Sequence, residues 1–203
     1  MMVSAELRWF WRDEPASEIK DWFHGGDVPA GGGRKLRRDR YFPHRGEPEL
    51  GVKFRDEGSE QEQVEIKGLV ATRPPRGLEL DVRRIEVWCK WSTSLRPAGP
   101  GLLVEKQRWL RKFADGVEEI PLREDEQPEQ RRVLSAAGCN VELTRIVLPD
   151  QGDIWWTLGF EAFGGLDRVC RLLAQTLRTR PPPCADPEHE LSYPAWLARY
   201  YGG

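Results

Sequence analysis

Charged side chains recur at every second position in several segments of the sequence where they alternate with apolar residues. In "LGVKFRDE", Lys53 and Arg55 fall on one face of an extended strand, and in "VEKQRWL", Lys106 and Arg108 do the same. Each pair lies opposite an apolar row, because alternate side chains of a strand point to opposite faces. Arg and Lys bind phosphate oxygens, whereas spaced carboxylates bind Mg²⁺ or Mn²⁺. Such faces, brought together, could bind a polyanion.

Other strands carry charges of both signs in the same arrangement. In "SAELRWFW", Glu6 and Arg8 share one face, while Leu7, Trp9 and Trp11 form the other. The full pattern gives seven basic candidates for phosphate binding: Arg8, Lys53, Arg55, Lys67, Lys90, Lys106 and Arg108. Five acidic side chains could converge with them: Glu6, Glu65, Glu86, Glu142 and Glu161.

Most of the elements that position these residues are strands. Strand patterns cover residues 4–11, 34–42, 49–57, 63–70, 79–92, 102–113, 139–148 and 153–163, and the last two form a hairpin. Within residues 79–92 the apolar parity switches, which predicts a bulge or break near Arg83 and Arg84. Helical patterns begin at Ser17, as an N-cap, and cover residues 128–138 and 165–180.

The apolar strand faces and the apolar helix stripes must bury one another. Helices on the outside of a barrel would achieve this, and the charged strand faces would then line its interior. We therefore expect an α+β fold: an antiparallel β-barrel tunnel of about eight strands with helices packed on the outside, forming a single domain over residues 1–203. The ordinary alternative is that each charged face points to solvent.

Composition narrows the classes of partner. The chain has 203 residues, a formal net charge of −2 and a pI near 6.0, so it has no global attraction for nucleic acid or an anionic membrane. No apolar run approaches a membrane span, and the start lacks the layout of a signal peptide, so we expect a cytoplasmic protein. The 4 Cys show no metal-ligand spacing.

Six motifs, taken in order, resemble the CYTH superfamily, also called triphosphate tunnel metalloenzymes. "RDRYF" is similar to its aspartate-tyrosine strand, "LGVKFRDE" to its basic strand and "VEIKG" to its strand ending in an inward Lys. "VEKQRWL" is similar to its Lys-x-Arg strand, "TLGFEAF" to its Gly-aromatic-Glu strand and "SYPAWL" to its terminal Ser-Tyr element. The order matches over roughly residues 4 to 200, so the resemblance implies a tunnel that binds a triphosphate-bearing or polyphosphate ligand.

The resemblance also implies hydrolysis assisted by Mg²⁺ or Mn²⁺, with Glu6, Glu142 and Glu161 as the surviving metal or water ligands. The opening family signature, Glu-x-Glu-x-Lys, is Glu6, Arg8 and Phe10 here, and the closing Glu-x-Glu keeps only Glu161. Because Arg8 replaces a carboxylate, metal should bind weakly, and Arg8 could itself offset phosphate charge.

The damaged metal signature leaves a second function open. A catalytically inactive barrel could serve as a binding or protein-interaction module, and some of the 9 Trp could then form an exposed patch. The pattern favours the core for Trp9, Trp11, Trp91 and Trp109, which fit the helix-covered faces. Nucleic-acid binding by stacking is disfavoured, because it needs a net basic groove.

Overall fold

The computed structural model describes residues 1–203 except 26–29, 43–46, 94–98, 130–135, 184–185 and 203. The strands are β1 Met2–Arg12, β2 Gly31–Tyr41, β3 Leu50–Arg55, β4 Gln63–Arg73, β5 Ile85–Thr93, β6 Leu102–Ala114, β7 Glu118–Ile120, β8 Gly138–Leu148 and β9 Asp153–Gly164. The helices are α1 Ser17–His24, α2 Val169–Thr179 and α3 Tyr193–Tyr200, with a short 3₁₀ helix at Pro187–His189.

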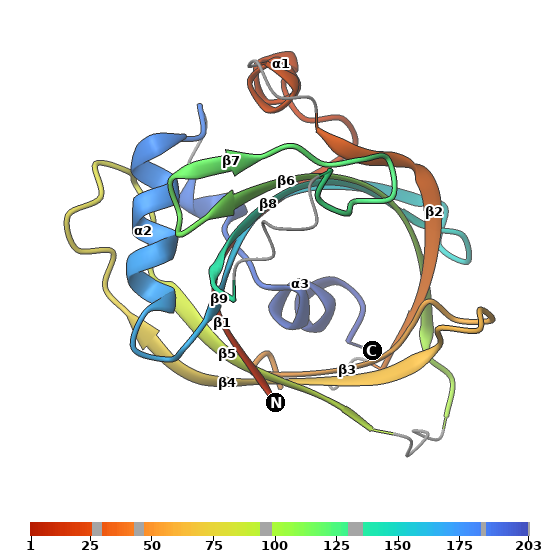
Figure 1. Cartoon of the computed structure of the whole chain (residues 1–203). Coiled ribbons are helices and arrows are strands. Elements are labelled where there is room, and N and C mark those ends of the chain that lie inside the picture. The colour runs from red at the N-terminus through yellow and green to blue at the C-terminus, as the bar shows by residue number, and fades with distance from the viewer. Residues whose placement is uncertain (26–29, 43–46, 94–98, 130–135, 184–185, 203) are drawn as a thin grey trace.

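The strands form one antiparallel sheet that closes on itself (Figure 1). Neighbouring strands follow the order β2-β3-β4-β5-β1-β9-β8-β6, and pairing of β2 with β6 completes the ring. Within the described residues, the barrel therefore has eight strands, while β7 extends the sheet beyond β6. The ring is joined least extensively between β2 and β3, where the register pairs Arg40 with Phe54 and Tyr41 with Lys53. The predicted fold class is confirmed.

The apolar strand faces point outward on one side of the barrel, where helices cover them. Leu7 and Trp9 of β1 pack in one cluster with Phe160 of β9 and with Leu173 of α2. Helix α1 adds Phe23 to the same cluster. Figure 1 shows α1 and α2 on the outer surface of the barrel, as the sequence predicts.

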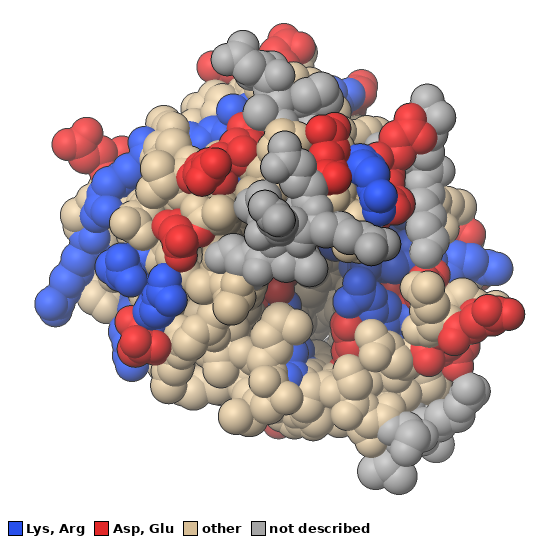
Figure 2. All heavy atoms as spheres, in the orientation of Figure 1, with Lys and Arg blue, Asp and Glu red and all other residues tan. Residues whose placement is uncertain are grey.

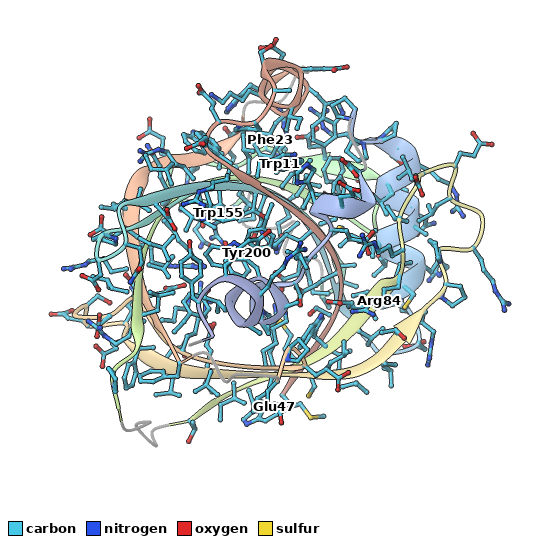
Figure 3. The ribbon with its side chains drawn as sticks, turned by 180° about the vertical axis from the view of Figure 1, so that it is seen from behind. Trp11, Phe23, Glu47, Arg84, Trp155 and Tyr200 are labelled. Carbon is cyan, nitrogen blue, oxygen red and sulfur yellow. The ribbon has the colours of Figure 1, made fainter. Side chains whose placement is uncertain are left out.

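Helix α3 lies inside the ring of strands, which differs from the expectation that the helices pack outside (Figure 1). Its Trp196 stacks on the inward-facing Phe10 of β1, with ring centroids 4.9 Å apart and an interplanar angle of 12°. Trp155 and Tyr200, labelled in Figure 3, also meet here, with centroids 4.8 Å apart. The inward face of β1 thus changes from charged to aromatic at Phe10, and α3 buries that aromatic end.

The bounds of three elements can be compared with those predicted from the sequence. Strand β5 begins at Ile85, which confirms a break near Arg83 and Arg84. Helix α1 does start at Ser17, but Ala16 is its N-cap residue and no side chain caps it. Most of the predicted helix 128–138 lies outside the described residues, and its last residue, Gly138, begins β8 instead.

The prediction that Trp91 belongs to the core is wrong. This residue is 41% exposed, so it does not belong to the core. Trp9 is fully buried, and Trp11 and Trp109 are partly buried against the cluster under the helices, as expected. Over the part of the chain that the structure describes, no helix has both the length and the apolar character needed to cross a membrane.

Candidate functional site: a charged cavity inside the barrel

The barrel encloses a cavity of about 770 Å³. All ten site residues predicted from the sequence line it: Arg8, Lys53, Arg55, Lys67, Lys90, Lys106, Arg108, Glu6, Glu142 and Glu161. Figure 2 shows Lys and Arg atoms inside a hollow near the middle of the face viewed in Figure 1. Alternation in the strands therefore does bring these side chains together, and the solvent-facing alternative is wrong for them.

The strand register places Arg8 and Glu142 on the same rung of the sheet. Arg8 of β1 and Glu142 of β8 each pair with Gly159 of the strand between them, β9. Because Gly159 has no side chain, the Arg8 guanidinium crosses β9 and its Nη2 donates to Glu142 Oε2 at 2.9 Å. Arg8 Nη1 donates to Thr157 Oγ1 at 3.3 Å, and the side chain is only 6% exposed.

Glu142 lies between two guanidinium groups. Its second oxygen, Oε1, accepts a hydrogen bond of 3.0 Å from Arg108 Nη1. Burial disfavours the charged carboxylate, but Arg108 and Arg8 outweigh that effect and hold the pKa of Glu142 well below its usual range. Arg108 also pairs with Glu126, which the alternation could not indicate because Glu126 belongs to a turn after β7.

Glu6 is shared in a similar way by two lysines. Its Oε2 accepts from Lys67 Nζ at 2.5 Å, and Lys90 Nζ lies 3.1 Å from Oε1. Against the cost of burial, these two ammonium groups hold the pKa of Glu6 well below its usual range. Glu161, directly opposite Glu6 in the register, pairs with Lys90 as well. Neither carboxylate is free of a basic partner.

Asp39 organises the third group of charges. This fully buried carboxylate lies 3.0 Å from Lys53 Nζ, 3.4 Å from Lys106 Nζ and 3.0 Å from Arg37 Nε. Despite burial, the pKa of Asp39 is held well below its usual range, chiefly by Lys53. The predicted site residues did not include Asp39 or Arg37, although the quoted "RDRYF" segment contains Asp39. Their shared parity on β2 is the signal that could have found both.

Lys106 is buried between two aromatic rings from different elements. Its Nζ lies 3.8 Å from the ring centroid of Tyr193 on α3 and 4.8 Å from that of Tyr41 on β2. It also donates to Tyr41 Oη. Burial, aided by the nearby positive charge of Lys53, lowers the pKa of Lys106 well below its usual value, although Asp39 opposes the shift. A phosphate in contact with Lys106 would favour its charged form.

Glu65 shows how these charges depend on pH. It contacts Lys53 at 3.1 Å and Arg55 at 2.8 Å, and these cations lower its pKa from 4.5 to about 2 although burial acts in the opposite direction. A carboxylate with a depressed folded-state pKa stabilises the fold above the unfolded-state pKa, and this contribution is lost as pH falls through the folded-state value.

We therefore expect Glu65→Gln to destabilise the protein at pH 6, and the difference from the unaltered protein should shrink between pH 4.5 and 2. Denaturant unfolding of both proteins across this range measures it. Glu60→Gln, at an exposed position, is the control and should show little difference at any pH. A Glu65→Gln difference that stays constant down to pH 2 would contradict the assigned pairing.

The cavity lining has a clear excess of positive side chains. Among the described residues, nine basic side chains line it: Arg8, Arg37, Lys53, Arg55, Lys67, Lys90, Lys106, Arg108 and Lys112. Five acidic side chains face them: Glu6, Glu65, Glu126, Glu142 and Glu161. Glu86, which we expected to join this set, instead lines an adjoining cavity of about 110 Å³ with Arg84 and Glu190, and Glu6 and Arg8 line this cavity as well. The chain as a whole is slightly acidic, so this basic excess is local.

The carboxylates do not form an open donor set for a divalent metal ion. Glu6, Glu142 and Glu161 each pair with at least one Lys or Arg. The Arg8 guanidinium crosses Gly159 of β9 and pairs with Glu142. Over the described residues, no three His, Cys, Asp or Glu side chains gather closely enough to hold a metal. A divalent ion would have to displace bound guanidinium or ammonium groups. The residues present therefore do not fit the metal that the resemblance implies.

Fold and site together define a closed antiparallel β-barrel with a net basic, ion-paired interior cavity. One solved structure with a similar fold is the Pct1 RNA triphosphatase of S. pombe in complex with the Spt5 CTD, at 14% sequence identity and a TM-score of 0.42. The alignment covers 90% of this chain and 85% of that one. No protein-family model matches the chain, and neither does any curated protein.

Proposed function

We propose that this protein binds a triphosphate-bearing or polyphosphate ligand inside the barrel. The observation that carries the proposal is the excess of nine basic over five acidic side chains around one cavity of about 770 Å³. That volume lies within the range of roughly 300–1,000 Å³ that is usual for small-molecule sites. Buried charges without compensation are costly, so an excess of one sign is best explained by a ligand of the other sign.

The sharing of carboxylates leaves the cations able to bind more oxygens. Glu142 is divided between Arg8 and Arg108, and Glu6 between Lys67 and Lys90. Arg8 and Lys67 are therefore only partly neutralised, whereas Arg108 also pairs with Glu126 and Lys90 also pairs with Glu161. Phosphate oxygens accept charge-assisted hydrogen bonds from such groups, and Arg can bind them in a bidentate manner. Lys53, Arg55, Lys67, Lys106 and Arg108 are the proposed phosphate clamp, supported by Arg8 and Lys90.

The proposal is confined to binding, because the carboxylates do not fit a metal-assisted reaction in this arrangement. The resemblance to triphosphate tunnel metalloenzymes supports the ligand class, through the basic strands that carry the matching motifs. The protein-interaction module remains the alternative. It would be favoured if the cavity bound no polyphosphate, since Trp91 is an exposed aromatic residue that a partner could contact.

Isothermal titration with tripolyphosphate, thiamine triphosphate and ATP, at low salt and with EDTA present, tests the proposal. We expect at least one of them to bind and to raise the unfolding free energy, by about 2.7 kcal/mol at a hundredfold excess over Kd. Binding should weaken steeply with added salt, since the contacts are ionic. Orthophosphate, with far less charge, should bind much more weakly.

Matched variants separate the cavity from general surface charge. Arg55→Gln removes a lining guanidinium and should weaken tripolyphosphate binding by about tenfold, the usual worth of a charge-assisted hydrogen bond. Arg76→Gln removes the same charge from an exposed loop and should leave Kd unchanged. Equal effects of the two variants, or the absence of binding by any polyphosphate tested, would overturn the proposal.

A further inference from the structure

The position of Arg8 bears on whether the cavity can bind a polyphosphate in its metal-free or its metal-bound form. Its guanidinium is held over Gly159, between Thr157 and Glu142, and lies 4.9 Å from the ring centroid of Tyr193. Burial favours the neutral form, yet Glu142 outweighs it and raises the pKa of Arg8, so the group stays charged. A fixed positive charge thus lies beside Glu142 and within electrostatic reach of Glu6.

The strand backbone is built to admit this side chain. A Cβ at position 159 would lie 2.5 Å from both terminal nitrogens of Arg8, closer than such atoms approach in proteins. Glycine in the middle of a strand weakens it and commonly marks a close approach by another group. Here that group is the Arg8 guanidinium. It has five N–H donors, and Thr157 and Glu142 accept from two of its nitrogens, so donors remain for a ligand oxygen.

A metal-bound polyphosphate is a poor match for this arrangement. A divalent ion on the phosphates would come within reach of Arg8, Lys90 and Arg108 and be repelled by them. Proteins commonly hold such an ion through one or two carboxylates, with water at its other coordination sites, whereas Glu6 and Glu142 are already ion-paired. The metal-free anion meets neither obstacle, and it carries more negative charge for the basic lining to bind.

We infer that the cavity selects the metal-free form of its polyphosphate ligand, with the Arg8 guanidinium as a built-in cation that contacts phosphate, so that Mg²⁺ opposes binding. This rests on the proposed function and deepens it by naming the ionic form of the ligand. A protein that uses Mg²⁺ or Mn²⁺ to hold its substrate would show the opposite response to metal.

The first test uses the unaltered protein and tripolyphosphate. Titrations are run with EDTA, with Mg²⁺ in excess over tripolyphosphate, and with Mn²⁺ in the same excess, at constant ionic strength. We expect affinity to be highest in EDTA and to fall at least tenfold when most of the ligand is complexed. Affinity that is unchanged or higher with either metal would overturn the inference, while the proposed function would stand. No binding in any condition would overturn the proposed function itself.

The second test asks whether Arg8 contacts the ligand or only neutralises Glu142. Arg8→Met should weaken tripolyphosphate binding in EDTA by at least tenfold. The double variant Arg8→Met/Glu142→Gln restores the net charge of the cavity but not the guanidinium, so it should still bind weakly. Restoration of the original affinity by the double variant would show that Arg8 only neutralises Glu142. Circular dichroism and thermal melting check that each variant folds.

Gly159→Ala gives an independent readout, because it displaces the guanidinium while keeping its charge. We expect it to weaken binding as Arg8→Met does. Arg8→Lys, which retains the charge in a smaller group, should recover part of the affinity and serves if Arg8→Met does not fold. Full affinity in both Gly159→Ala and Arg8→Lys would contradict a role for the placed guanidinium.

Discussion

Asp39→Asn is expected to lower the unfolding free energy by about 3–5 kcal/mol, the usual cost of removing one partner from a buried ion pair. The variant keeps the shape of the side chain but leaves Lys53, Arg37 and Lys106 without their common carboxylate. The side chain of Asp39 is fully buried, so water cannot take its place. Denaturant unfolding without ligand measures this loss.

The same substitution should strengthen ligand binding. It frees three cations of the cavity lining from the carboxylate they share, so an affinity gain of about tenfold, the usual worth of one charge-assisted hydrogen bond, is expected. Tripolyphosphate should thus stabilise Asp39→Asn more than the unaltered protein. Asp81→Asn, at an exposed position, is the control and should change neither quantity. Weaker binding by a folded Asp39→Asn protein would contradict the role given to these three cations.

Arg111→Leu is expected to destabilise the protein by a similar amount, about 3–5 kcal/mol, for a reason unrelated to the ligand. Arg111 lies on the outward face of β6 and is 1% exposed. Its Nε and Nη2 donate to the backbone carbonyls of Phe23 and Gly25 at 2.6 and 2.9 Å, and it pairs with Glu119. The guanidinium therefore holds the carboxyl end of α1 against the barrel, and leucine would leave Arg180 as the side-chain donor to these carbonyls and Glu119 without its buried partner.

Hydrogen exchange should show where the Arg111→Leu protein is loosened. Protection of the amides of α1 should fall more than that of β8 or β9, because Arg180 alone would then hold the last carbonyls of the helix. Arg171→Gln, on the exposed side of α2, is the control and should unfold like the unaltered protein. Tripolyphosphate affinity should be retained if Arg111→Leu folds. A loss of less than about 1 kcal/mol would show that α1 does not depend on Arg111.

The strand pattern was predictable because both faces of these strands are under strong constraint. Period-2 alternation in β1 and β6 places one row under helices and the other in the cavity, and in β4 it points Lys67 into the cavity; a register shift of one residue would exchange the two rows. This is why Lys67, Lys106 and Arg108 could be assigned to one site from their positions alone. The break before Ile85 was visible for the same reason, since the apolar parity changes there.

Residues outside that alternation were harder to predict. Glu126 reaches the cavity from a turn, where no periodicity marks its direction. Helix α3 was not among the helices predicted from the sequence, so its position inside the barrel could not be predicted either. Phe10 explains why α3 is buried inside the barrel. It is an aromatic residue at the end of a charged row, and Trp196 of α3 stacks on it. It also means that lysine at position 10, as in the family signature, would be buried against that ring.

The role of Arg8 lies between these cases. Its inward direction followed from alternation, and its departure from the family signature was visible in the sequence. Its partner across β9 was not, because the pairing with Glu142 depends on a shared rung with Gly159. That glycine, within a strand rich in large side chains, is the signal that a bulky group approaches there.

A crystal structure of the protein with tripolyphosphate, grown without divalent metal, tests the central claim most directly. We predict that the anion lies inside the barrel, with phosphate oxygens within hydrogen-bond distance of Arg8, Lys106 and Arg108, and with the partners of Glu6 still in place. An anion bound only on the outer surface, or a cavity that stays free of it at a saturating concentration, would contradict the account.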